Sequence, residues 1–207
     1  MPSRRPIGVY WGRFNPPHEG HLRVIRRFRK DYRLVVAVGS SERSNERSNP
    51  FSGRERKAML EAYLRERGVR GVRVVTLNDG PSEAWAVEAL VRRCHPDVLL
   101  LSSEKSRLVR LAERHVPVLR FPRRGTISSS RIRRAIASGD PVWKTLTGRS
   151  VGELIERWDG VRRIRRAYRR PILPKPRSAG GRPRRGRSAS AHVRGKASSP
   201  ARPSEVR

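Results

Sequence analysis

Five short runs of apolar residues recur along the first 121 residues of the chain, and polar stretches separate them. Most of the runs are continuous in valine, leucine and isoleucine rather than alternating with polar residues. Continuous runs of this length are typical of strands buried on both faces, as in a parallel sheet. We therefore predict strands at Ile7–Trp11, Leu34–Val38, Val72–Leu77, Val98–Leu101 and Val116–Phe121.

The stretches between these runs have helical spacing. After the first run, Leu22, Ile25 and Phe28 form one apolar stripe, and the next stretch opens with the capping box "SGRE" and stops near Gly68. Two further helices are predicted at 83–93 and 106–114. Strands that alternate with helices indicate an α/β fold with a Rossmann-like, doubly wound, five-stranded parallel sheet. In such sheets ligands bind beyond the carboxyl ends of the strands.

The pattern changes after the fifth run. The stretches "ISSSRIRRAIASGD", "SVGELIERWDG" and "VRRIRRAYRR" predict C-terminal helices. From Pro171 the chain is rich in Pro, Gly, Ser and Arg and holds few large apolar residues, so it cannot bury enough surface to offset its ordering entropy. We predict one domain over residues 1–170 and a disordered basic tail over residues 171–207.

The formal net charge of +31 is unevenly spread. The tail holds ten Lys or Arg and one acid, Glu205, which suits non-specific binding to polyanions. In the body of the chain the same excess is either a solvated surface or a polyanion contact. With a single cysteine, Cys94, no apolar run of about 20 residues and no signal-peptide core, we expect a cytoplasmic protein without a membrane span.

Candidate chemistry begins at "GRFNPPHEGHL", residues 12–22, where the first strand gives way to a helix. Gly12 allows a phosphate to approach, Arg13 supplies charge, and His18 and His21 share a face of the first helical turn. A metal site is the other interpretation of an H-x-x-H pair. It is disfavoured because Cys94, His95 and His115 have no ligand spacing relative to that pair.

Two motifs carry a family resemblance. "GRFNPPHEGH" resembles the H-x-G-H signature of the nucleotidyltransferase superfamily, and "ISSSRIR", residues 127–133, resembles its second signature, I-S-S-T-x-I-R. By itself the second motif is equally a serine-capped helix with exposed arginines. Together, in this order, the two are similar to archaeal-type nicotinamide-nucleotide adenylyltransferases, and the resemblance covers residues 7 to about 168.

The resemblance implies transfer of AMP from ATP to nicotinamide mononucleotide, giving NAD and pyrophosphate. It assigns catalysis to His18, His21 and Arg133, and it implies Mg²⁺ that arrives with ATP rather than a metal held by the protein. We also expect a homo-oligomer. ATP-binding roles fall on Gly12, Arg13, Phe14, Arg47, Ser128, Ser129, Ser130 and Arg131.

The acceptor site follows the resemblance less closely. Trp85 matches a tryptophan that stacks on the nicotinamide ring, although a core tryptophan explains it equally well. The family carries asparagine where this chain has Ser82, and S-G-N or S-N-N where it has "SSEKS", which includes Ser102 and Ser103. Nicotinate mononucleotide and phosphopantetheine therefore stay open as acceptors. A nucleic-acid-binding protein on the same fold is the alternative of another class.

Overall fold

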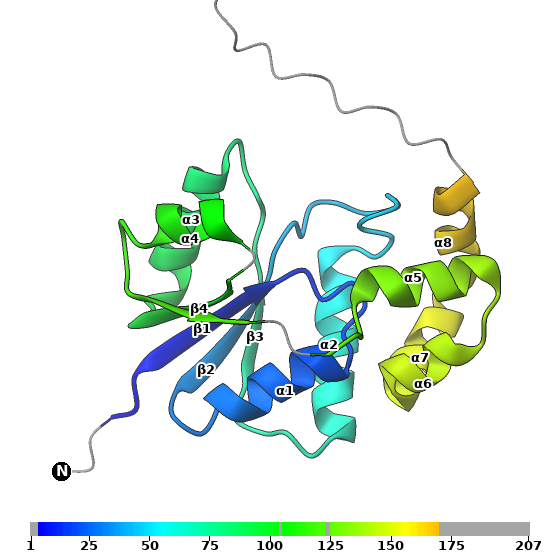
Figure 1. Cartoon of the computed structure of the whole chain (residues 1–207), viewed down its shortest axis with the longest axis horizontal. Coiled ribbons are helices and arrows are strands. Elements are labelled where there is room, and N and C mark those ends of the chain that lie inside the picture. Colours follow the sequence, from blue (N-terminus) through cyan, green and yellow to red (C-terminus); the bar gives the residue numbers. More distant parts are fainter. Residues whose placement is uncertain (1–3, 104, 123–124, 170–207) are drawn as a thin grey trace, which may run out of the picture. The chain divides into compact units, whose positions relative to one another are not determined.

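The five apolar runs form the five strands of one parallel sheet in the computed structural model, which describes residues 4–103, 105–122 and 125–169. The spatial order is β3-β2-β1-β4-β5, and every neighbouring pair is parallel. The predicted Rossmann-like, doubly wound sheet is confirmed (Figure 1). The strands are β1 (Ile7–Gly12), β2 (Arg33–Val38), β3 (Arg73–Thr76), β4 (Val98–Ser102) and β5 (Val118–Phe121).

Each face of the sheet has its own apolar core. Alternate residues of one strand enter different cores: Tyr10 packs on one side, and Val9 and Trp11 pack on the other. Helices α1 (Glu19–Phe28) and α2 (Gly53–Glu66) cover the first face, while α3 (Glu83–Cys94) and α4 (Ser106–Ala112) cover the second. Burial on both faces explains why the strands are continuous apolar runs.

Four helices follow β5 and pack beside α2 (Figure 1). One of them, α6, was not predicted; it has only six residues, follows Pro141, and lacks a side-chain cap that would mark its start. The strand β5 is also shorter than predicted, because Pro117 has no N–H to donate to a ladder. The four helices are α5 (Ser129–Ser138), α6 (Val142–Thr147), α7 (Arg149–Arg157) and α8 (Gly160–Arg169).

The order of the strands reverses between β1 and β4, which are neighbours in the sheet but not in the sequence. Their pairing ends at Tyr10 opposite Leu100, two residues before each strand finishes at Gly12 and Ser102. The carboxyl ends of these two strands are therefore unpaired with each other, and a crevice at such a reversal is where ligands bind in doubly wound sheets.

None of the helices in the described part of the chain is long and apolar enough to cross a membrane. The predicted tail, residues 171–207, lies outside the described residues.

Candidate active site

A cavity of about 710 Å³ opens at this crevice. Its walls come from the ends of β1, β4 and β5 and from the first turns of α1 and α5, which lie more than a hundred residues apart in the sequence. It brings together most of the residues predicted for catalysis and ATP binding, together with one predicted acceptor residue: Gly12, Arg13, Phe14, His18, His21, Ser102, Ser128, Ser129, Ser130 and Arg133.

The two histidines are held by the start of α1. His18 is the N-cap, and its Nδ1 accepts a hydrogen bond of 3.1 Å from the backbone N–H of Gly20. His21 returns the interaction, because its Nδ1 accepts from the backbone N–H of His18 at 3.2 Å. A neutral imidazole whose Nδ1 accepts carries its proton on Nε2. The capping box therefore fixes both rings as Nε2–H donors at the cavity wall.

Gly20 is the residue that lets His18 lie where it does. A Cβ atom at Gly20 would lie 2.9 Å from Cε1 and 3.0 Å from Nδ1 of the His18 ring. The two histidine rings also contact each other, with centroids 3.8 Å apart. The spacing H-x-G-H is therefore explained locally: the outer residues cap the helix, and the glycine leaves room for the first ring.

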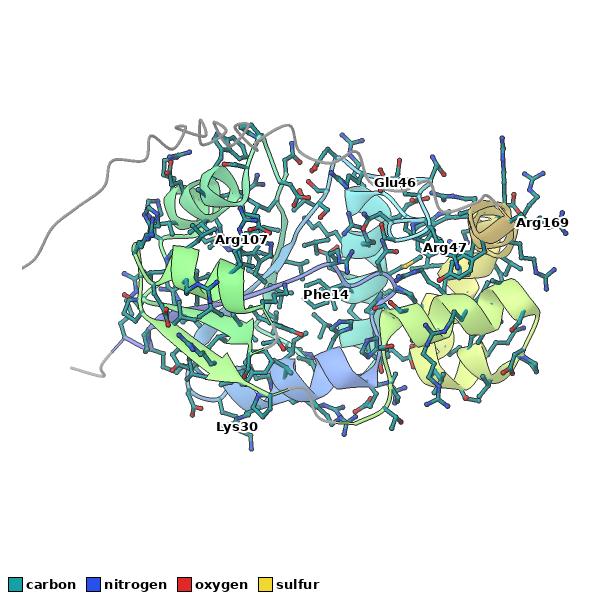
Figure 2. The ribbon with its side chains drawn as sticks, turned by 45° about the horizontal axis from the view of Figure 1, so that its top comes forward. Phe14, Lys30, Glu46, Arg47, Arg107 and Arg169 are labelled. Carbon is teal, nitrogen blue, oxygen red and sulfur yellow. The ribbon has the colours of Figure 1, made fainter. Side chains whose placement is uncertain are left out.

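Phe14 supports the histidine pair from beneath. It is a buried residue with a positive φ of 51°, and its ring lies 4.8 Å from that of His21 and 5.3 Å from that of Tyr10. Figure 2 shows Phe14 in the interior of the molecule, between the sheet and the C-terminal helices. This ring fixes the depth at which His21 enters the cavity.

The second predicted motif is joined directly to the first. Ser129 Oγ donates to the carbonyl oxygen of Pro16 at 2.9 Å, and Arg133 Nη1 donates to the carbonyl oxygen of Asn15 at 2.6 Å. Arg133 also holds the Ser130 hydroxyl at 3.2 Å. These bonds attach the first turn of α5 to the loop before α1, so two helix N-termini face the same cavity. Helix N-termini attract anions.

The charge of the cavity is positive. Its described lining includes Arg13, Arg23, Arg27, Lys105 and Arg133 and contains no carboxylate side chain. Burial lowers the pKa of Arg133 from its usual value, while nearby Tyr168 raises it again. An arginine so placed still carries its charge at neutral pH. Cations, hydroxyls and helix N-termini around one cavity form a site for a polyphosphate.

No group of three or more His, Cys, Asp or Glu side chains placed to hold a metal ion occurs among the described residues.

A buried arginine organises the loops next to the cavity. Arg56 of α2 has no exposed surface and donates to the carbonyl oxygens of Arg13 at 2.8 Å, Gly39 at 2.7 Å and Ser40 at 2.6 Å. Its Nε donates to the carbonyl oxygen of Phe51 at 3.0 Å. Burial, with a contribution from Arg13, lowers the pKa of Arg56 to about 10, so the group stays charged at neutral pH. One side chain thus joins the loops after β1 and β2.

Comparison with known proteins agrees with this geometry. Residues 9–135 match the Cytidylyltransferase-like family model. The chain is 36% identical to a nicotinamide-nucleotide adenylyltransferase of Pyrobaculum neutrophilum, over 76% of this chain and 91% of the relative. It is 32% identical to the enzyme of that name from Pyrococcus abyssi, over 76% and 87%. The chain belongs to the nicotinamide-nucleotide adenylyltransferase family. The resemblance seen in the two motifs is thereby confirmed.

The fold of this family member has a solved counterpart. A bifunctional NMN adenylyltransferase/ADP ribose pyrophosphatase from Francisella tularensis superposes with a TM-score of 0.59 at 19% sequence identity. The match covers 82% of this chain and 58% of that one. At this level of identity the likeness supports the nucleotidyltransferase fold.

Some predicted residues of this adenylyltransferase lie outside the cavity lining. Arg47 stacks its guanidinium over the Tyr168 ring, 4.3 Å from its centroid, and in Figure 2 it lies towards Arg169 rather than towards Phe14. Arg131 is exposed on α5, beyond the lining. The phosphate-binding roles of Arg47 and Arg131 therefore stay predictions.

The predicted acceptor residues divide in the same way. Ser102 lines the cavity, whereas Ser103 is exposed and its backbone N–H pairs with β5. Ser82 is the N-cap of α3 and accepts from the backbone N–H of Trp85 at 3.1 Å. Trp85 is 38% exposed, which disagrees with a fully buried core position and leaves part of its ring free to contact a ligand.

Several residues at the site were not predicted as functional. Lys105, Arg23 and Arg27 line the cavity, yet in the sequence they are ordinary charged residues of helix starts and helix faces. Asn15 and Arg56 are buried polar residues whose partners lie in other elements. Within the motif and the capping box their polar character was visible, but their partners depend on tertiary contacts.

Proposed function

We propose that this chain transfers the adenylyl group of ATP to nicotinamide mononucleotide and so forms NAD and pyrophosphate. The observation that carries the proposal is the cavity in which the H-x-G-H turn and the start of α5 are bonded to each other. Family membership supports the same reaction, since the relatives from Pyrobaculum and Pyrococcus bear the name of that enzyme.

The triphosphate of ATP would lie between the two helix N-termini. We assign His18 and His21 to its phosphate oxygens as Nε2–H donors, with Arg13 and Arg133 neutralising charge. The hydroxyls of Ser128 to Ser130 face the same space and are available to the outer phosphates. Because these groups are held by capping and backbone bonds before substrate arrives, little reorganisation is needed when negative charge builds up.

The chemistry needs no protein base. A 5′-phosphate oxygen of the acceptor, already an anion, forms a bond to the α-phosphorus of ATP. The bond from that phosphorus to the oxygen that bridges it to the β-phosphate breaks, and pyrophosphate leaves with the electron pair. Positioning the two phosphates and stabilising the crowded α-phosphorus are then the main tasks of the protein. His21, on the first turn of α1 and supported by Phe14, is the donor we assign to that phosphorus.

Mg²⁺ would enter as part of the nucleotide substrate. The described cavity lining offers hydroxyls and cations rather than carboxylates, so we expect phosphate oxygens and water to supply the ligands of the ion.

The test is incubation with ATP, Mg²⁺ and a panel of phosphorylated acceptors, with dinucleotide products identified by mass. We expect NAD from nicotinamide mononucleotide and none when Mg²⁺ is omitted. His21→Ala should lower turnover at least about a hundredfold, as loss of a transition-state donor does, and change ATP affinity much less. His115→Ala, at an exposed position outside the cavity lining, is the control. Absence of any dinucleotide would refute the proposal.

A further inference from the structure

The end of the cavity at the crevice between β1 and β4 holds an unpaired buried hydroxyl. Ser102, the last residue of β4, is 7% exposed and lines the cavity. Its Oγ is fully buried and has no hydrogen-bond partner among the described residues. Buried polar groups are nearly always paired, so a partner for Ser102 Oγ is expected from what enters the cavity.

An ammonium group lies at the same end. Lys105, the N-cap residue of α4, lines the cavity and extends its Nζ to the carbonyl oxygen of Trp11, 3.3 Å away. Lys105 therefore reaches from the loop after β4 across to the end of β1. An ammonium and a hydroxyl at one end of a cavity are donors that suit a carboxylate.

This end of the cavity neighbours the exposed tryptophan. An ion pair of 3.0 Å between Glu83 and Arg107 ties the first turn of α3 to the first turn of α4. Trp85 lies on that turn of α3, and Lys105 immediately precedes α4. The two helices lie side by side on one face of the sheet, so the indole ring and the ammonium belong to the same edge (Figure 1).

The charges of the two pyridine nucleotides distinguish them at such an edge. Nicotinamide mononucleotide presents a positive pyridinium ring with a neutral amide, which a lysine ammonium repels. Nicotinate mononucleotide presents the same ring with a carboxylate, which pairs with the ammonium and accepts from a hydroxyl. An aromatic face is suited to stacking on either ring.

We propose that Lys105 and Ser102 recognise the carboxylate of nicotinate mononucleotide, and that this chain adenylylates it as well as nicotinamide mononucleotide. The inference rests on the proposed function and adds a determinant of the acceptor. The reaction is balanced as before: an acceptor phosphate oxygen binds the α-phosphorus of ATP, pyrophosphate leaves, and nicotinate adenine dinucleotide is the product.

The experiment measures kcat/KM for both acceptors at saturating MgATP. Wild-type protein should use nicotinate mononucleotide at least as efficiently as the amide. Lys105→Met should lower kcat/KM for the nicotinate about tenfold to a hundredfold, as loss of a charge-assisted hydrogen bond does, and affect the amide far less. Ser102→Ala should shift the ratio in the same direction by a smaller factor. Lys30→Met, on the surface beyond α1, is the matched control (Figure 2).

The outcomes separate this inference from the proposed function. Equal losses for both acceptors would overturn it, because Lys105 would then bind the phosphate that the two share. NAD formation without any use of nicotinate mononucleotide would also overturn it and leave the proposed function standing. Failure with both acceptors would refute the proposed function itself. If Lys105→Met lowers the melting temperature, Lys105→Gln, which keeps a polar group, gives the same ratio test.

Discussion

Replacing Gly20 by alanine separates the geometry of the histidine pair from the stability of the helix. The new Cβ would lie 2.9 Å from Cε1 and 3.0 Å from Nδ1 of His18, whereas ordinary carbon contacts begin near 3.5 Å. The ring must therefore move by about half an ångström or more, and its 3.1 Å bond to the Gly20 N–H is disturbed. A displacement of about 1 Å can cost a hundredfold in rate, so we expect kcat to fall about tenfold to a hundredfold.

The stability of the same variant should hardly change. Alanine is favoured over glycine inside a helix by roughly 0.5–1 kcal/mol, and the weakened N-cap costs about 1 kcal/mol, so the two contributions nearly cancel. Steady-state NAD formation and thermal unfolding, measured on one preparation, give both quantities. A Gly20→Ala protein with wild-type kcat would refute the role assigned to the position of His18.

Gly152 provides the matched control for this substitution. It lies within α7, and a Cβ atom there would meet Trp143 at 3.8 Å and Thr147 at 4.0 Å, which are ordinary contacts. Gly152→Ala should therefore stabilise the protein by roughly 0.5–1 kcal/mol and leave kcat unchanged. A similar loss of activity in this control would mean that glycine replacements act through the fold in general.

Three further predictions follow from other parts of the chain. Trp85→Ala should raise the KM of the acceptor about tenfold to a hundredfold, and that of ATP less, if the exposed indole stacks on the pyridine ring; normal acceptor kinetics would contradict the stacking. Partial burial alone would raise the pKa of Glu55, but bonds from Arg163 and the Ser52 N–H lower it overall, so its stabilising effect should be complete above its ordinary value of 4.5 and be lost as the pH falls through the lowered one. Acid unfolding of Glu55→Gln should show a weaker pH dependence there. Deletion of residues 171–207 should leave adenylyl transfer intact and reduce duplex DNA binding that weakens steeply between about 50 and 200 mM salt; unchanged binding would place the polyanion surface on the folded body.

The sequence was sufficient for the sheet because burial on both faces leaves a plain trace. Each predicted strand overlaps an observed one, and the order of elements determined the crevice. The capping serines and histidines were also visible, because caps are local interactions. Short α6 escaped prediction, since it has neither a capping side chain nor enough turns to show a period.

The remaining parts of the site depend on contacts between distant segments. The loop that holds Arg47 could not be placed from its own residues, and its stacking on Tyr168 comes from the packing of α8. Lys105 is one lysine of a polar loop until the register of β4 beside β1 brings it to Trp11. The oligomeric state, the cytoplasmic location and the properties of the tail stay predictions.

The buried guanidinium of Arg56 has a consequence for how substrates enter and products leave. Its bonds hold the carbonyl groups after β1, those after β2 and the residue before the cap of α2 together, with no water between. Moving one of these loops would break charge-assisted bonds to the others, so they are expected to move as one rigid body or not at all. Opening of the cavity would then fall to the opposite wall, where Gly125, Thr126 and Ile127 lead from β5 into α5. Pyrophosphate and dinucleotide would depart past that hinge, at a rate set by its motion rather than by the loop that bears the histidines.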